Sequence, residues 1–322
     1  MSRVGEFDFI AQSLAPLSSG YEGAFGLTDD AALLAQKAGL VVTTDTLVQG
    51  VHFRSDDPLD LVARKALRVN ISDLVAMAAK PHAFLLSIVW PEDIRQDQQN
   101  LFVDGLSADV SQYSIPLIGG DTTRGGDRLV ITITAFGEVD APLRRSGARP
   151  GDRVFVSGTI GDGFLGLGAA DTGLPQHQVE QLNTRYLLPE PRVELIEALR
   201  QIASAGLDIS DGLVSDAGHL ARASGVSLDI RLEDVPLSDP ARLWLSRQDN
   251  GVDAWSSLFT GGDDYEMLFC VPEKERNALL TAAQACGVPV TEIGEIAEGE
   301  GVRVTDDSSK IVQILRTGFT HF

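Results

Sequence analysis

Apolar and polar positions along the chain follow two periods, and segments of the two kinds alternate. Short apolar or β-branched runs indicate strands, whereas apolar residues spaced three or four apart indicate helices. The first half predicts strands over 40–45, 82–90, 115–121 and 128–139, and helices over 60–80 and 97–113. The second half predicts strands over 153–159, 207–212, 227–232, 265–271, 290–296 and 302–306, and helices over 178–188, 189–206 and 213–225.

This alternation predicts a mixed α/β fold in both halves. The chain has 322 residues, which is long for a single hydrophobic core, so we expect two domains. The segment APLRRSGARPGD over 141–152 has no periodicity and is rich in Pro, Gly and Arg, which is typical of a linker. The expected organisation is therefore an N-terminal domain over 1–140, this linker, and a C-terminal domain over 153–322.

Composition and charge exclude several kinds of partner. The net charge is −20, from 46 acidic and 26 basic residues, which argues against nucleic acid and anionic membranes because both need basic surfaces. Phosphate ligands stay possible, since a bound cation can invert the local field. The N-terminus lacks a secretory signal and the apolar run 83–90 is too short to span a membrane, so we expect a cytoplasmic protein.

Aspartates recur in one context along the chain. Each follows an apolar or β-branched run and small residues, where open α/β sheets place ligand sites. Taken alone, each of them is better explained by a turn or a helix cap, and only their number at strand ends favours a ligand site. The residues in this context are Asp29, Asp30, Asp45, Asp121, Asp208, Asp211, Asp263 and Asp264, and Asp73 lies within a predicted helix.

These acids would need a counter-charge if the fold brought them together. Two carboxylates 4 Å apart repel by about 4 kcal/mol at an effective dielectric of about 20. Oxygen ligands without clustered His or Cys favour hard cations, Mg²⁺ above all. Thr43 and Thr44, directly before Asp45, add neutral oxygens. The pattern therefore predicts Mg²⁺ that in turn holds phosphate groups.

The sequence offers no standard phosphate-binding loop. No lysine follows a glycine, so a Walker A motif is absent, and arginines such as Arg124 and Arg145 are the basic candidates. Gly161, Gly163 and Gly166 spell G-x-G-x-x-G after a predicted strand. The second strand and acid that a dinucleotide fold needs do not follow, so a tight turn is favoured.

Nine segments, taken in order, resemble the thiamine-monophosphate kinases of the aminoimidazole ribonucleotide synthetase-like superfamily. The match runs from residue 5 to about 269, and an aromatic C-terminal tail adds to it. The segments are GEFDFI, TDDAALL, VTTDTLVQGVHF, KALRVNISDLVAMAAKP, LIGGDTTRG, RSGARPGD, RYLLPEPR, LDISDGLVSD and GGDDYEMLF.

The resemblance implies transfer of the ATP γ-phosphoryl group to thiamine monophosphate, giving thiamine diphosphate, with several Mg²⁺ ions. It also implies two α/β domains and a homodimer that pairs the N-terminal sheets. The residues that match metal ligands of the family are Asp30, Thr43, Thr44, Asp45, Asp73, Asp121, Asp208 and Asp211. Those that match ATP contacts are Gly120, Asp121, Arg145 and Ser210, and those that match substrate contacts are His52, Asp263 and Phe319.

Two positions depart from the family pattern, and three alternatives stay open. Thr28 replaces a usual Gly beside Asp30, and Asp263 replaces a usual Glu. Another ATP-using enzyme of the superfamily is the nearest alternative, although the reactive terminal cysteines of selenophosphate synthetase and of the hydrogenase maturation protein are absent. A non-catalytic nucleotide- or cation-binding protein and a dinucleotide oxidoreductase are the other two.

Overall fold

The computed structural model describes residues 10–18, 20–22 and 39–314. They form two compact units. Unit 1 holds the described residues up to Leu74 together with Ala79–Asp140, and unit 2 holds Val75–Ala78 and the described residues from Ala141 onward. Between Val139 and Arg153 the chain has no helix or strand.

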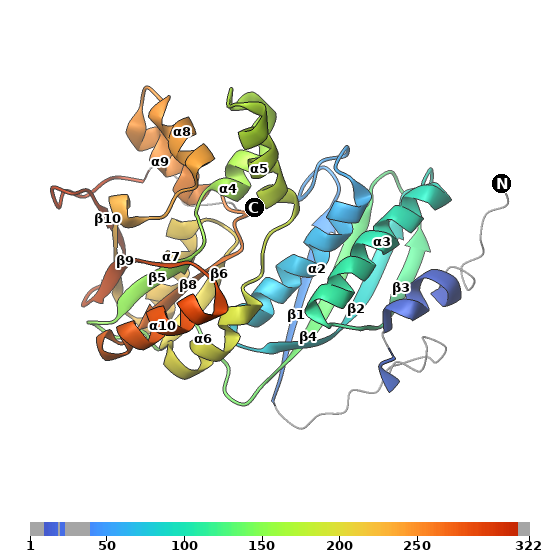
Figure 1. Ribbon diagram of the computed structural model, residues 1–322, viewed down its shortest axis with the longest axis horizontal. Helices are drawn as coiled ribbons and strands as arrows, with labels where there is room; N and C mark the ends of the chain where they lie inside the picture. Colours follow the sequence, from blue (N-terminus) through green and yellow to red (C-terminus); the bar gives the residue numbers. More distant parts are fainter. Residues whose placement is uncertain (1–9, 19, 23–38, 315–322) are drawn as a thin grey trace. The chain divides into compact units, whose positions relative to one another are not determined.

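Unit 1 is a four-stranded sheet with two long helices on one face (Figure 1). The strand order is β1-β4-β2-β3, antiparallel except for the parallel pair β2–β3. The bounds are β1 Gly39–Val48, α2 Leu59–Ala76, β2 Lys80–Trp90, α3 Gln96–Tyr113, β3 Leu117–Arg124 and β4 Val130–Val139. The short helices η1 Ile10–Leu14 and η2 Ala15–Ser18 precede them.

Burial alternates strictly along β4, so its two faces differ. Ile131 and Ile133 are buried on the face that α2 and α3 cover, whereas Thr132 and Thr134 lie on the open face and are half-buried. One face of β4 is thus left uncovered in the single chain. The open face is mixed, because it carries the threonines Thr44, Thr46, Thr132 and Thr134 and also apolar side chains such as Val42, which is 54% exposed.

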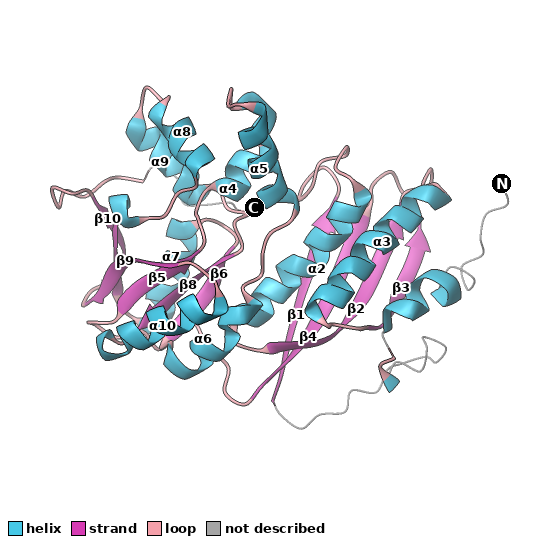
Figure 2. Ribbon diagram, viewed as in Figure 1, coloured by secondary structure: helices cyan, strands magenta, loops and turns pink. Residues whose placement is uncertain are grey.

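The buried carboxylate of Asp109 in α3 fixes α2 against α3. It accepts two hydrogen bonds from Arg68, at 2.6 and 3.0 Å, and one from Arg64 at 2.9 Å. Both arginines are in α2, which places the two helices in one layer (Figure 2). A paired and hydrogen-bonded carboxylate of this kind is tolerated inside a protein, whereas an unpaired one is not.

Unit 2 contains a six-stranded mixed sheet of order β10-β7-β9-β5-β8-β6. Its strands are β5 Arg153–Ser157, β6 Ala205–Ile209, β7 Ser227–Arg231, β8 Glu266–Val271, β9 Val290–Ala297 and β10 Gly301–Thr305. Its α-helices are α4 Asp162–Leu167, α5 Gln176–Leu187, α6 Ile196–Ile202, α7 Leu213–Ser224, α8 Asp239–Ser246, α9 Gly251–Thr260 and α10 Arg276–Cys286. The short helices are η4 Ala169–Asp171, η5 Val193–Leu195, η6 Leu232–Asp234 and η7 Glu273–Glu275.

Both faces of this sheet are buried. Val154 and Val156 of β5 belong to the large apolar core that includes residues of α7. Phe155, between them, must point to the other face, where its ring stacks on Phe269 at 5.9 Å between centroids. Figure 1 shows α6 and α10 on one side of the sheet and α7 on the other.

The predicted α/β class is correct, and several predicted bounds are wrong. The strand expected to end at Asp45 continues to Val48, and the strand expected to end at Asp121 continues to Arg124. The helix predicted over 60–80 ends at Ala76, because Ala78 has a left-handed backbone and β2 already begins at Lys80. Of the helix predicted over 189–206, only 193–202 is helical, as η5 and α6.

None of the helices within the described ranges is long and apolar enough to cross a membrane.

Candidate metal and nucleotide site

Unit 1 gathers Thr43, Asp45 and Asp73 between β1 and α2. Thr43 Oγ1 donates a hydrogen bond of 2.5 Å to Asp73 Oδ2. Asp45 lies two residues further along β1, so its side chain is on the same face as Thr43. Its main-chain N–H donates to Oδ1 of the buried Asn70, one helical turn before Asp73, at 3.1 Å. Three of the predicted metal ligands thus form one group of oxygen atoms.

The electrostatics of this group favour a bound cation. Burial, and then the negative charge of Asp73, raise the pKa of Asp45 to about 6 from an ordinary value of 3.8. A raised carboxyl pKa means that the second negative charge is unfavourable where it stands. A divalent cation would relieve that repulsion, and the donors, which are carboxylate and hydroxyl oxygens, are of the kind that Mg²⁺ prefers.

Thr44 does not add its side chain to the group. It alternates with Thr43 and Asp45, so its hydroxyl points to the open face of the sheet. There Thr44 Oγ1 donates to the carbonyl of Ile133 at 3.0 Å and accepts a hydrogen bond from Thr134 Oγ1 at 3.1 Å. Only a main-chain atom of Thr44 could contact the cation that Asp45 contacts.

Asp121 and Gly120 lie in β3, at the opposite edge of the sheet from Asp45. β1 and β3 are the two edge strands of the described sheet, with β4 and β2 between them. Three strand spacings separate the edges by about 14 Å. Asp121 also pairs with the exposed Ser87, and therefore faces the open side. One chain thus does not bring Asp121 to Asp45.

Gly120 has a local structural reason to be glycine. A Cβ atom at this position would lie 1.8 Å from the carbonyl oxygen of Leu86 in the neighbouring strand. Any other residue would push β3 away from β2. The close approach of the two strands therefore requires Gly120 whether or not a nucleotide binds there.

His52 lies in the loop after β1. Its Nδ1 accepts a hydrogen bond from the main-chain N–H of Val48 at 3.0 Å. Because Nδ1 is the acceptor, a neutral His52 ring carries its proton on Nε2.

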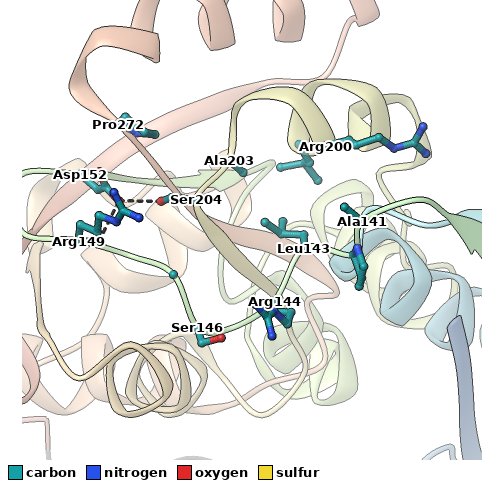
Figure 3. A pocket seen from close by; sticks show the side chains of 13 residues that line it. Ala141, Leu143, Arg144, Ser146, Arg149, Asp152, Arg200, Ala203, Ser204 and Pro272 are labelled. Atoms are coloured by element: carbon teal, nitrogen blue, oxygen red, sulfur yellow. Dashed lines mark hydrogen bonds between the residues drawn. The ribbon is translucent and has the colours of Figure 1, made fainter. Parts of the chain in front are cut away.

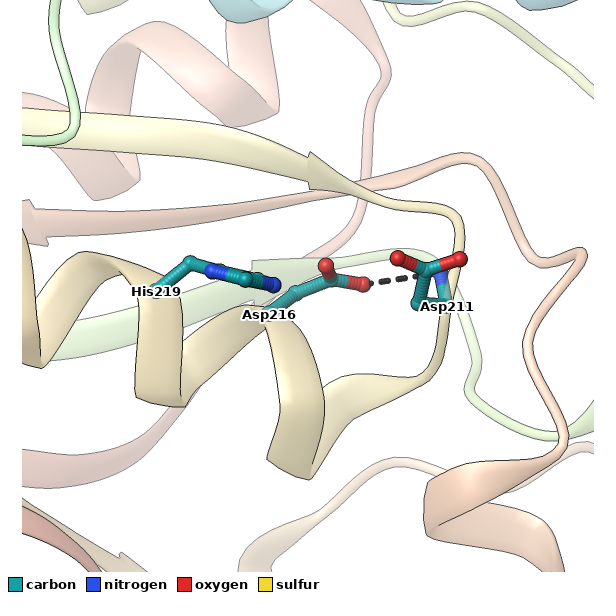
Figure 4. Close-up of side chains that lie close together, drawn as sticks. All are labelled: Asp211, Asp216 and His219. Carbon is teal, nitrogen blue, oxygen red and sulfur yellow. Dashed lines mark hydrogen bonds between the residues drawn. The ribbon is translucent and has the colours of Figure 1, made fainter. Parts of the chain in front are cut away.

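Unit 2 holds a second group of possible ligands at the start of α7 (Figure 4). One ligand atom from each of Asp211, Asp216 and His219 lies within 4.8 Å of the others. Asp216 and His219 are one turn apart on α7, and Asp211 is in the turn before the helix. Sequence reasoning found Asp211 and missed its two partners, although their spacing of three residues on a predicted helix was visible.

Ser210 and Arg145 belong to the surroundings of this second group. Oδ2 of Asp216 accepts the N–H groups of Ser210 and Asp211, at 3.1 and 3.0 Å. Burial, and then the charge of Asp211, raise the pKa of Asp216 to about 7, while those N–H groups and the charge of Arg145 act to lower it. Asp208 is buried in β6 and is not one of the three grouped residues.

Asp263 lies directly beside the same turn. Its N–H donates to the carbonyl of Ser210 at 2.8 Å, and the N–H of Tyr265 donates to the carbonyl of Ile209 at 2.8 Å. Asp263 itself has a left-handed backbone, with φ of 67°. Three predicted residues, Ser210, Asp211 and Asp263, therefore come from two loops that hold each other.

The glycine pattern of GDGFLG binds a protein carboxylate. The N–H groups of Gly161 and Gly163, at the start of α4, donate to Asp264 at distances of 2.8 to 3.0 Å. Asp264 thus occupies the position that a pyrophosphate would take in a dinucleotide fold. A Cβ at Gly163 would lie 2.1 Å from the carbonyl of Asp263, so close packing explains this glycine. The expected tight turn is wrong, because Gly161 is the N-cap of α4 and the segment is helical from Asp162 onward.

Glu266, in the same GGDDYEMLF motif, is a fully buried carboxylate that we had not singled out. It accepts hydrogen bonds from Arg192 at 2.5 and 2.7 Å, from Arg185 at 2.6 Å and from Ser157 at 2.6 Å. Four such bonds to one buried group make it a structural centre of unit 2.

Four residues named from the sequence, Thr28, Asp29, Asp30 and Phe319, lie outside the described residues. For the described ones, the structure forms one group from Thr43, Asp45 and Asp73 and places Ser210, Arg145 and Asp263 around Asp211.

Comparisons with known proteins agree with these two units. The family of AIR synthase related proteins matches by its N-terminal domain over residues 28–139 and by its C-terminal domain over 149–307. The hydrogenase maturation protein HypE, in complex with ATP, shares the fold at 18% identity, with a TM-score of 0.78 over 98% of this chain and 96% of that chain.

More similar proteins are thiamine-monophosphate kinases. The protein of that name from Caulobacter vibrioides is 46% identical over 302 residues, which is 92% of this chain and 85% of that protein. The one from Escherichia coli K12 is 40% identical over 99% of this chain and 98% of its own length. A structure described as AaThiL complexed with AMPPCP and TMP is 33% identical, with a TM-score of 0.79, and covers 100% of this chain and 99% of that one. The chain therefore belongs to the thiamine-monophosphate kinase family, within the AIR synthase related proteins.

Proposed function

We propose that this protein uses ATP to phosphorylate thiamine monophosphate, giving thiamine diphosphate and ADP. The observation that carries the proposal is the group of oxygen atoms formed by Thr43, Asp45 and Asp73, where burial, and then the charge of Asp73, raise the pKa of Asp45 and so favour a bound cation. Support comes from relatives of that name at up to 46% identity, and from the related structure with AMPPCP and TMP.

The proposed reaction is a direct, in-line transfer. An oxygen of the thiamine monophosphate phosphate forms a bond to the γ-phosphorus, while the bond from that phosphorus to the β–γ bridging oxygen breaks and ADP leaves. Such a transfer requires positioning and charge neutralisation, and no protein nucleophile. When bound, Mg²⁺ neutralises the charges of two phosphate groups that otherwise repel.

In this proposal the oxygen groups of each unit hold several Mg²⁺ ions. Asp45 and Asp73, with Thr43, would hold them in unit 1, together with Asp30 and a main-chain atom of Thr44. Asp211 and Asp208 would do so in unit 2. A carboxyl with a pKa of about 6, as Asp45 has, is ionised at neutral pH and able to bind.

The remaining proposed roles concern the two substrates. Arg145 and Ser210 would contact the nucleotide, because both lie near the Asp216–Asp211 turn. Gly120 and Asp121 would also contact the nucleotide. For thiamine monophosphate, His52 would donate from Nε2 to the phosphate, Asp263 would contact the cationic or hydrogen-bonding part of thiamine, and Phe319 would lie against its ring.

The positions of Asp45 and Asp121 support the proposed homodimer. The two residues are on opposite edges of one sheet, so they can share a metal ion only if they come from two chains. We therefore propose that each complete site takes Asp121 from one protomer and Asp45 from its partner.

The activity test is incubation of the protein with ATP, Mg²⁺ and thiamine monophosphate. Chromatography should show thiamine diphosphate and ADP formed in equal amounts, and EDTA should stop both. Free thiamine in place of the monophosphate is the control for the acceptor. If folded protein forms no thiamine diphosphate, or releases ADP without it, the proposed function is wrong.

A further inference from the structure

Unit 2 contains a cavity that is lined in part by the linker. None of the residues that line it belongs to the two groups of possible metal ligands described above. Its volume is about 400 Å³. The linker segment after Ala141, helix α6 and the residues that follow it, and Pro272 line it (Figure 3). A cavity of this size is in the range that binds small organic molecules, and it is much larger than a single inorganic ion needs.

Basic side chains surround this cavity in a strongly acidic chain. Arg144, Arg149 and Arg200 line it, although the protein carries a net charge of −20. Within the described part of the chain, neither Arg144 nor Arg149 has a side-chain hydrogen bond or ion pair. Arg200 is partly engaged, with Glu197 at 3.5 Å and the carbonyl of Ala78 at 3.4 Å. Two guanidinium groups are thus available to an anion.

The wall behind the arginines is fixed by hydrogen bonds. The buried Asp152 accepts at Oδ2 from the N–H of Arg149 at 3.0 Å and from Ser204 Oγ at 2.7 Å. The N–H of Gly206 donates to the carbonyl of Arg144 at 3.0 Å. The main chain at Arg144 and Arg149 is therefore fixed within unit 2. Oδ2 of Asp152 already accepts two hydrogen bonds.

The rest of the lining is apolar. Leu143 and Leu199 are buried, and Ala203 and Pro272 complete this part of the wall. Figure 3 shows Arg149 and Asp152 toward one end of the cavity, and Arg144 and Leu143 toward the other. A site with charged donors at its rim and an apolar wall recognises a molecule that has both an anionic and an organic part.

We propose that this cavity binds a small organic phosphate, with Arg144 and Arg149 contacting its anionic groups from the two ends of the cavity and the Leu143–Leu199 wall on the organic part. The neighbouring Arg145 belongs to the other face of the linker, since its charge acts on Asp216. The site would therefore be separate from the proposed nucleotide site. It needs no metal ion, because the arginines supply the positive charge themselves.

The test is isothermal titration of the full-length protein in EDTA at low salt. The probes are inorganic phosphate, pyrophosphate, AMP, ADP and thiamine monophosphate. At least one organic phosphate should bind several-fold more tightly than inorganic phosphate. The double variant Arg144→Ser/Arg149→Ser should weaken that binding at least about tenfold, the loss expected for charge-assisted hydrogen bonds.

Two matched variants control for general charge effects and for the nucleotide site. Arg128→Ser removes an exposed arginine that does not line the cavity, and it should leave binding unchanged. Arg145→Ser removes the expected nucleotide contact and should also leave the binding in EDTA unchanged. The thermal unfolding midpoint of the double variant should equal that of the wild type, because neither side chain has a partner to lose.

Several outcomes would overturn the proposal. These are the absence of binding by every probe, equal affinity for inorganic and organic phosphates, and full binding by the double variant. Equal weakening by Arg128→Ser would show non-specific attraction. Loss of binding in Arg145→Ser alone would assign the probe to the nucleotide site. None of these outcomes bears on whether thiamine monophosphate is phosphorylated.

Discussion

The main-chain N–H of Asp45 in β1 donates a hydrogen bond to Oδ1 of Asn70 in α2, at 3.1 Å. Asn70 is fully buried, and its Nδ2 donates to the carbonyl of Ala66 at 2.9 Å. Its amide is therefore held by its own helix while it fixes the backbone of the neighbouring strand. Since β1 is an edge strand of the described sheet, this bond also pairs a main-chain N–H near the free edge.

We predict that Asn70 positions Asp45 for cation binding. Asn70→Ala should lower the apparent affinity for Mg²⁺ about 10–100-fold, as loss of a positioning contact typically does. It should also destabilise the protein by about 1–3 kcal/mol, because a buried N–H loses its partner. Titration of activity with Mg²⁺, together with urea unfolding in EDTA, measures the two effects separately.

Asn100→Ala is the matched control, because Asn100 is an exposed amide on α3 that bonds only to Gln96 among the residues described. It should leave both quantities near those of the wild type. If Asn70→Ala lowers the unfolding free energy but leaves the Mg²⁺ dependence of activity unchanged, the role of Asn70 is structural only. That result would refute the positioning role.

A second prediction concerns the sharing of the site between two chains. Asp45→Asn and Asp121→Asn should each reduce turnover on the order of a hundredfold, because each removes a charged ligand and keeps the size of the side chain. A mixture of the two variants, unfolded and refolded together, should form heterodimers with one intact site. Equal mixing should recover up to about a quarter of the wild-type activity.

The control for this complementation is each variant refolded alone at the same total concentration. Neither should recover activity. If the mixture is as inactive as its components while sedimentation shows dimers, then Asp45 and Asp121 do not share a site across chains. A monomer in sedimentation would remove the proposed homodimer altogether.

These positions also show what the sequence could and could not predict. The threonines and aspartate of VTTDT were correctly placed on a strand, and the thiamine kinase motifs named the chemistry. The strand does not end at Asp45, however, because Asn70 and Asp73 in α2 satisfy its polar groups and the strand continues to Val48. A local sequence pattern cannot show that a helix distant in the sequence supplies hydrogen-bonding partners to the strand.

Sheet order was the other quantity that local patterns did not provide. Asp45 and Asp121 both look like acids that follow apolar runs, and only the order β1-β4-β2-β3 shows that they lie at opposite edges. Helices α8 and α9 were missed because each is short, at 8 and 10 residues, and offers few helical turns over which a period is visible.

A third prediction concerns the pH dependence of stability. Burial raises the pKa of Asp264 to about 8, even though the N–H groups of Gly161 and Gly163 act to lower it. The folded state therefore keeps a proton that the unfolded state releases above its ordinary pKa of 3.8. This contribution to stability is complete below pH 3.8, and it is lost as the pH rises through about 8.

Asp264→Asn keeps an oxygen acceptor for the two glycines and removes the titration. Between pH 5 and pH 8.5 the wild type should therefore lose more unfolding free energy than this variant, by on the order of a few kcal/mol. Urea unfolding at both pH values measures the difference. Asp127→Asn, an exposed carboxyl, should follow the wild type. If the unfolding free energies of Asp264→Asn and the wild type change equally between the two pH values, Asp264 is ionised at both of them.

The last prediction concerns the acceptor, and the backbone at Asp263 decides which variant tests it. Asp263 has φ of 67°, a left-handed conformation that costs alanine about 1–2 kcal/mol and that asparagine tolerates. Asp263→Ala would therefore combine strain with the loss of charge. Asp263→Asn removes the charge alone and keeps the hydrogen bond of its N–H to Ser210, so it is the sharper variant.

Asp263→Asn should raise KM for thiamine monophosphate about tenfold, the value of one charge-assisted hydrogen bond, and leave KM for ATP unchanged. Asp263→Glu, which restores the usual family residue, should keep KM at or below the wild-type value. Phe319→Ala should raise the same KM several-fold to about thirtyfold, because a cation–π contact contributes about 0.5–2 kcal/mol. The measurement is a pair of KM values for each variant. A rise confined to KM for ATP would place Asp263 and Phe319 at the nucleotide and remove both from the thiamine site.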